Sequence, residues 1–130
     1  MEKANILVID DEKGIRDLLE YEFSAHGYRV TTAGDGLEGL EKVKHEKFHL
    51  VISDIKMPKL DGIQTLEKIK QIDPNVEVIM ATGFGTIETA IQSIKKGAYD
   101  YIQKPFQMQE ILAIAEKALE NYRITALLGA

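Results

Sequence analysis

The feature that most constrains this fold is a strict alternation of short apolar runs with segments of helical spacing. Ile6–Ile9, Leu50–Ile52 and Val76–Ala81 are almost wholly apolar. Such runs are typical of strands that are covered on both faces in a parallel sheet. Two further strands are predicted over Tyr28–Ala33 and Tyr99–Gln103.

Helical segments are predicted between these runs. Asp35, Asp61 and Thr86 are the expected N-caps, and Gly27 and Gly97 the expected helix stops. Strict β/α alternation implies right-handed crossovers, so the predicted fold class is α/β with a doubly wound parallel sheet. The apolar residues that recur at helical spacing are Ile15, Leu18, Leu19, Phe23, Leu37, Leu40, Val43, Ile63, Leu66, Ile69, Ile87, Ile91 and Ile94.

Composition narrows the class of protein further. A chain of 130 residues fits one domain with a real core. It has no cysteine, so disulfides and thiolate metal ligands are excluded and a cytoplasmic setting is expected. The net charge of -5 argues against nucleic-acid binding. No apolar run approaches the roughly 18 residues that span a bilayer, so no membrane partner is expected.

The chemically active side chains stand where the predicted strands end. In doubly wound sheets the functional cleft lies beyond the carboxyl ends of the strands, so these side chains are expected to converge. They are Asp10 and Asp11 after the first strand, Asp54 after the third, Thr82 after the fourth and Lys104 after the fifth.

This set of residues has a definite chemistry. Three neighbouring aspartates repel one another and need a hard divalent cation, and oxygen ligands without His or Cys favour magnesium over zinc. A carboxylate can also attack phosphorus and form an acyl phosphate. With an ammonium and a hydroxyl beside the cation, the set is complete for phosphoryl transfer to Asp54.

Each of these residues also has a simpler interpretation. Asp10 and Asp11 could cap the first helix, where carboxylates favour the positive end of the dipole. Asp54 could be a turn residue, Thr82 an ordinary loop hydroxyl, and Lys104 a solvated surface lysine. The functional interpretation depends on the side chains meeting in space.

Four motifs occur in order along the chain: ILVIDDE, VISDIKMPKLDG, ATGFG and GAYDYIQKPF. Together they resemble the receiver domain of bacterial two-component response regulators, from about Asn5 to Asn121. The run from Met80 to Phe106 resembles especially the receivers of sigma-54-dependent transcriptional activators. The resemblance implies a flavodoxin-like receiver fold with five parallel strands in the order 2-1-3-4-5. It also implies a receiver domain over residues 1–121, with 122–130 as the end of the last helix or the start of a linker.

The resemblance implies a role for each site residue. Asp54 would accept a phosphoryl group from the phosphohistidine of a sensor histidine kinase, with Mg²⁺ as cofactor. Thr82 and Lys104 would hold the phosphoryl oxygens, and Tyr101 matches the aromatic switch position, although an aromatic residue in a strand is equally consistent with core packing. The Mg²⁺ ligands would be Asp10 (through a water), Asp11, Asp54 and the backbone carbonyl of Lys56.

The same resemblance implies a signalling phosphoacceptor that catalyses only its own phosphorylation and dephosphorylation. Phosphorylation would draw Thr82 towards the new oxygens and let Tyr101 turn, which shifts the face formed by the fourth helix, fifth strand and last helix. This face would control an output domain or partner in transcription regulation.

A homodimer through that face and the last helix, Met108 to about Leu127, is a further hypothesis. The apolar arc of this helix is wider than the roughly 100° of an ordinary surface helix; the alternative explanation is a broad core face. The arc consists of Ile111, Ile114, Ala115, Ala118 and Tyr122, extended by Leu112, Leu119 and Ala126.

Two other classes of protein remain open at this stage. A phosphatase of the haloacid-dehalogenase type also forms an aspartyl phosphate, but it needs a second Asp two residues after the nucleophile, where this chain has Lys56. A flavodoxin-like cofactor binder would need a phosphate-cradling loop after the first strand. The DDEKG segment there is acidic and would repel phosphate.

Overall fold

The computed structural model describes residues 4–83 and 86–128. Phe84 and Gly85, the end of the ATGFG motif, lie outside the described residues. None of the helices in the described part is long and apolar enough to cross a membrane. The elements in chain order are β1 (Asn5–Ile9), α1 (Lys13–Ala25), β2 (Arg29–Ala33), α2 (Gly36–His45), β3 (Leu50–Ser53), α3 (Gly62–Ile72), β4 (Glu77–Thr82), α4 (Ile87–Lys95), β5 (Asp100–Gln103) and α5 (Met108–Leu127).

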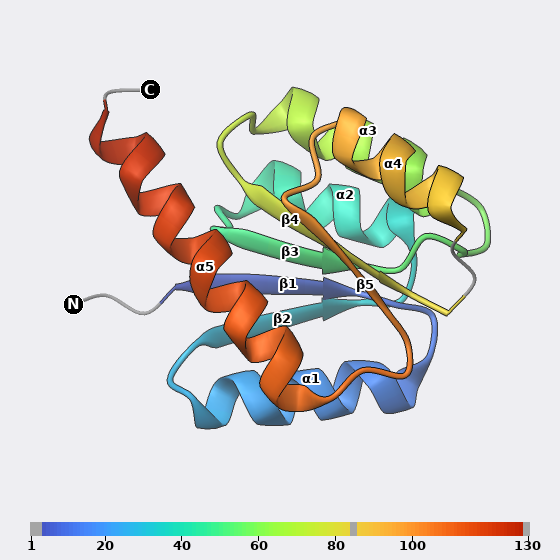
Figure 1. The fold of residues 1–130 in the computed structure, drawn as a ribbon, viewed down its shortest axis with the longest axis horizontal. Coiled ribbons are helices and arrows are strands. Elements are labelled where there is room, and N and C mark those ends of the chain that lie inside the picture. The colour runs from blue at the N-terminus through green and yellow to red at the C-terminus, as the bar shows by residue number, and fades with distance from the viewer. Residues whose placement is uncertain (1–3, 84–85, 129–130) are drawn as a thin grey trace.

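The strands form one parallel sheet in the order β2-β1-β3-β4-β5. Helices α1 and α5 cover one face of the sheet, and α2, α3 and α4 lie on the other (Figure 1). The predicted fold class and strand order are therefore confirmed. Three strands begin one residue later than predicted, at Arg29, Glu77 and Asp100.

The local signals at the helix ends act as predicted. The side chains of Asp35, Asp61 and Thr86 each accept a hydrogen bond from the backbone N–H of the third residue of the helix that follows. This contact satisfies one of the donors that a helix N-terminus leaves open. Gly27 and Gly97 follow α1 and α4 with φ values of 92° and 110°, which a residue without a Cβ adopts at little cost.

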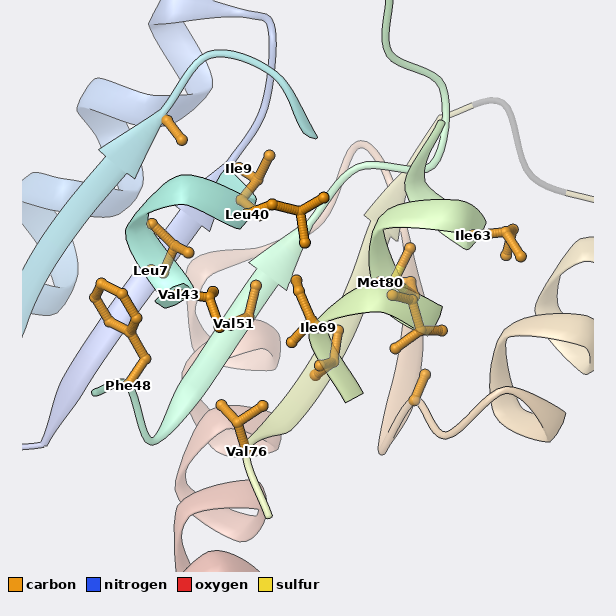
Figure 2. Packing of buried hydrophobic residues seen from close by; sticks show 14 of the residues in the cluster. Leu7, Ile9, Leu40, Val43, Phe48, Val51, Ile63, Ile69, Val76 and Met80 are labelled. Carbon is orange, nitrogen blue, oxygen red and sulfur yellow. The ribbon is translucent and has the colours of Figure 1, made fainter. Parts of the chain in front are cut away.

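The core has two parts, one on each face of the sheet. Figure 2 shows the part in which side chains of β1, β3 and β4 pack against α2 and α3, with Leu7, Val51 and Met80 fully buried. On the other face, α1 contributes Phe23 and α5 contributes Ile111, both fully buried. Full burial of such a side chain stabilises the fold by roughly 2 kcal/mol.

The helical spacing locates α4 correctly, but most of its apolar face is not buried. Ile87, Ile91 and Ile94 are 81%, 51% and 47% exposed. These residues recur four and then three positions apart, so they form one apolar stripe along the helix. We call Ile87, Ile91 and Ile94 the α4 stripe.

Helix α5 shows the opposite behaviour. Most of its wide apolar arc packs against its own sheet, because the central residues are buried and their flanking neighbours are partly buried against the same core. The broad core face is therefore the better explanation of the arc. The exposed large apolar residues at the end of α5 are Ile124 and Leu127, followed by Leu128, where the helix extends past the beginnings of the strands (Figure 1).

Candidate functional site

The acidic residues converge because β1 and β3 are adjacent and in register. Ile9 and Ser53, the last residues of these strands, are partners in the ladder, and the N–H of Asp54 donates to the Ile9 carbonyl at 3.0 Å. Asp10 and Asp54 therefore leave the sheet side by side. The carboxylates with oxygens within 4.8 Å of one another are those of Asp10, Asp11, Glu12 and Asp54.

Lys104 joins this cluster from the end of β5. Its Nζ lies 2.7 Å from Asp10 Oδ2, 3.0 Å from Asp54 Oδ2 and 3.4 Å from Glu12 Oε1. The side chains of Lys104, Asp10 and Asp54 are only 12%, 4% and 2% exposed. Hydrogen bonds between buried ions of opposite sign are among the strongest in proteins, so one ammonium holds the two buried carboxylates together.

The charges of the site influence one another. Burial raises the pKa of Asp10, although the hydrogen bond from Lys104 acts in the opposite direction. Burial alone would lower the pKa of Lys104, but its hydrogen bonds with Asp10 and Asp54 outweigh burial and raise the pKa. The two directions are compatible, because two carboxylates stabilise the Lys104 ammonium, while at Asp10 burial outweighs the hydrogen bonds from Lys104 and from the Glu12 N–H.

Asp54 is also held from the loop that follows it. Its Oδ1 accepts a hydrogen bond from the N–H of Lys56 at 3.3 Å, and the first residue of α3, Gly62, donates to the Ile55 carbonyl at 2.6 Å. A Cβ at Gly62 would overlap the Asp54 carbonyl oxygen and lie 2.5 Å from the Cα of Ile55. Glycine at this position lets α3 begin directly against the backbone that carries Asp54.

The neighbouring strands β4 and β5 carry Thr82 and Tyr101. Thr82 is fully buried at the end of β4, and its carbonyl accepts the N–H of Lys104 at 3.0 Å. Tyr101 is half-buried, opposite Met80 in the β4–β5 ladder and packed against the core. The Lys104–Pro105 peptide bond is cis. The phosphoryl-binding and switch roles of these residues remain predictions.

The simpler interpretation of the first acidic pair is not supported. The N-cap of α1 is Glu12, and it makes no side-chain cap hydrogen bond. Asp10 Oδ1 instead accepts from the Glu12 N–H at 2.9 Å, which fixes the carboxylate inside the cluster. Glu12 was not among the predicted ligands, although its place directly after the acidic pair was a usable signal.

The donor set fits a hard divalent cation. The grouped side chains offer carboxylate oxygens alone, two of the carboxylates are buried and two are exposed, and Lys104 is the cation paired with three of them. Mg²⁺ is commonly held by one or two carboxylates with waters at its other positions. The residues present therefore fit Mg²⁺, while the ligand role of the Lys56 carbonyl stays a prediction.

Comparison with known proteins gives consistent matches. The family model for the response regulator receiver domain matches residues 6–116. The transcriptional regulatory protein ZraR of Klebsiella oxytoca is 37% identical over 95% of this chain, and the DNA-binding transcriptional regulator NtrC of Escherichia coli K12 is 35% identical over 95%. A CheY-like receiver domain protein from Methanospirillum hungatei matches with a TM-score of 0.93 at 32% identity, covering 95% of this chain and 99% of its own.

The matches also bear on the alternatives. The chain spans 28% of the length of ZraR and 26% of NtrC. These relatives confirm the expected resemblance to the receivers of sigma-54-dependent activators. The haloacid-dehalogenase alternative is not supported.

Replacing Lys104 by Met should destabilise the metal-free protein by about 3 kcal/mol, because two buried carboxylates lose their shared ammonium. The double variant Lys104→Met/Asp54→Asn should recover part of this loss. Urea unfolding in EDTA measures both. The matched control is Lys13→Met, because Lys13 pairs with Asp17 on the exposed face of α1 and should cost less than about 1 kcal/mol. Equal losses for the two single variants would show that Lys104 has no special role in holding the cluster.

Proposed function

Because this chain belongs to the family of response regulator receiver domains, we propose that it is a phosphorylation-controlled switch whose phosphoacceptor is Asp54. The observation that carries this proposal is the buried triad in which Lys104 bridges Asp10 and Asp54. A lysine held there is ready to pair with the oxygens of a phosphoryl group on Asp54. The proposed donor is a phosphohistidine of a sensor histidine kinase.

The chemistry at Asp54 follows from its surroundings. One carboxylate oxygen attacks phosphorus, the bond from phosphorus to the donor's imidazole nitrogen breaks, and its electron pair remains on the imidazole. Lys104 then pairs with the phosphoryl oxygens, and the Thr82 hydroxyl donates to one of them. Mg²⁺, held by Asp10, Asp11, Asp54 and the Lys56 carbonyl, would supply the positive charge that offsets the charge of the phosphoryl group.

The switch extends from Thr82 to the face formed by α4, β5 and α5. A phosphoryl group adds about -1.5 to -2 charges at the sheet edge and draws the Thr82 side chain towards it. Thr82 ends β4, and Tyr101 lies half-buried in the neighbouring strand, so a shift of one side chain changes the space open to the other. The α4 stripe begins a few residues after Thr82 and is exposed. It gives α4 an apolar surface that an output domain or partner can contact.

The wider setting is inferred from the relatives. They are named as transcriptional regulators, so the proposed output is control of transcription in the cytoplasm, with no nucleic acid bound by this domain. The proposed domain covers residues 1–121, with 122–130 as the end of α5 or the start of a linker. Apart from its own phosphorylation and dephosphorylation, the proposed domain catalyses no reaction.

Incubation with acetyl phosphate and Mg²⁺ should add one phosphoryl group to the chain, and Asp54→Asn should prevent this. The reason is that the amide has lost the nucleophilic carboxylate oxygen. Intact-protein mass spectrometry gives the answer directly. Asp61→Asn is the matched control, because Asn caps a helix as well as Asp does and labelling should be unchanged. Full labelling of the Asp54→Asn variant would refute the assignment of Asp54.

Replacing Asp11 by Ala should raise the metal-free melting temperature and abolish most of the stabilisation by Mg²⁺. Asp11 is an exposed member of the cluster, so its removal relieves repulsion among the carboxylates. In the original chain, Mg²⁺ at ten times its Kd should stabilise by roughly 1.4 kcal/mol. Thermal melts in EDTA and in excess Mg²⁺ compare the two, with Asp17→Ala on α1 as the control that should keep its Mg²⁺ response. A destabilised Asp11→Ala variant with an intact response would assign Asp11 a structural role.

Dimerisation through the α4-β5-α5 face is part of the same proposal. Light scattering should show a dimer in the presence of Mg²⁺ and beryllofluoride, a mimic of the phosphoryl group, and Ile91→Asp in the α4 stripe should weaken it. Ile72→Asp is the control, because Ile72 is a similarly exposed apolar residue on α3. A monomer with and without beryllofluoride would reject the dimer for this chain.

A further inference from the structure

Asp10 is held by hydrogen bonds from four directions. Its N–H donates to the Ala33 carbonyl at 3.1 Å, Oδ1 accepts from the Glu12 N–H at 2.9 Å, and Oδ2 binds Lys104 at 2.7 Å. The fourth contact is to the backbone carbonyl of Asp10, which accepts a hydrogen bond from Arg16 Nη1 at 2.8 Å. Arg16 thus contacts the site through the backbone of Asp10, and its guanidinium does not pair with the carboxylates that Lys104 bridges.

The helix itself brings Arg16 to this place. The Arg16 N–H donates to the Glu12 carbonyl at 3.1 Å, in the first turn of α1. Side chains on a helix point back towards its N-terminus, so the guanidinium reaches the turn that precedes α1. A Cβ at Gly34 would lie 3.6 Å from Arg16 Nη1 and 3.6 Å from Glu38 Oε1. The half-buried Arg16 therefore lies between the β1–α1 loop and the β2–α2 loop.

The contact has a geometric consequence for the acidic pair. The carbonyl that Arg16 binds belongs to the peptide unit joining Asp10 to Asp11, and that unit is planar. A charge-assisted hydrogen bond to its oxygen fixes the orientation of the whole plane. The position of the Asp11 Cα is fixed with it, so the Asp11 side chain can turn only about its own backbone and side-chain dihedral angles. Arg16 also brings a further positive charge to a cluster in which Lys104 neutralises only part of the negative charge.

We propose that Arg16 is a positioning residue for the Mg²⁺ site. By holding the Asp10 carbonyl, it orients the Asp10–Asp11 peptide so that both carboxylates face the ion. This inference rests on the proposed function, because it assumes that the acidic cluster binds Mg²⁺. Groups that orient the ligands of a metal change its affinity by about 10- to 100-fold when they are removed.

The test is a titration with Mg²⁺ of the original chain and of the variants Arg16→Met and Lys13→Met. Two-dimensional amide NMR, recorded well below the melting temperature, monitors each titration. Arg16→Met should raise the Mg²⁺ Kd about tenfold or more. Its metal-free spectrum should show shifted signals for Asp11 and Glu12, with the amides of α5 unchanged. Lys13→Met removes the same charge from the same helix, but the Lys13 ammonium is exposed and pairs with Asp17, so water screens it and a Kd within about twofold of the original is expected.

The outcomes separate the two claims. If the original chain does not bind Mg²⁺, the proposed function fails and this inference fails with it. If the original chain binds Mg²⁺ and Arg16→Met binds it with the same Kd, the inference alone is overturned. An equal rise in Kd for Lys13→Met would also overturn it, because net charge would then explain the effect. Should Arg16→Met not fold, Arg16→Gln serves instead; its side chain is too short to reach the carbonyl, and the same rise in Kd is expected.

Discussion

The constraint on which the site depends is the mutual repulsion of carboxylates gathered at one edge of the sheet. Like charges a few ångströms apart oppose folding even at an effective dielectric near ~20. In this chain, Asp10 and Asp54 are almost fully buried and share the ammonium of Lys104. The arrangement is stable enough to form, yet it leaves negative charge for a cation to neutralise. The proposed binding of Mg²⁺ and transfer of a phosphoryl group to this site would depend on this incomplete neutralisation.

The topology explains why a lysine from the far end of the chain serves this purpose. Strand β5 is two strands away from β3, which corresponds to about 10 Å at the usual spacing of neighbouring strands. A lysine stem spans a large part of that distance, so Lys104 reaches across the end of β4, the strand that ends with the fully buried Thr82. The same reach means that a charge placed on Asp54 acts on β4 and β5 together. The proposed signal therefore begins at Asp54 and Lys104, whose side chains are already in contact across the end of β4.

The two helical layers have different consequences for function. Helix α5 uses most of its wide apolar arc to pack on the sheet, whereas the α4 stripe remains exposed. An exposed apolar stripe costs solubility unless it serves an interaction. This contrast makes α4 the better candidate for a partner contact. The argument for a dimer therefore rests on the exposed α4 stripe and no longer on the width of the apolar arc of α5.

The sequence by itself determined the elements, their order and the membership of the central triad. Strand periodicity, the caps at Asp35 and Asp61, and the placement of Asp10, Asp54 and Lys104 at strand ends are local signals, and parallel strands with short connections bring such ends together. Only the tertiary structure decided which surfaces are covered and which backbone groups form hydrogen bonds with side chains. Helical spacing shows that a helix has an apolar face but not whether another element covers it, so the exposure of α4 could not be read from the sequence. The contact of Arg16 with the Asp10 carbonyl is equally invisible there, because it depends on where a carbonyl points after its strand has ended.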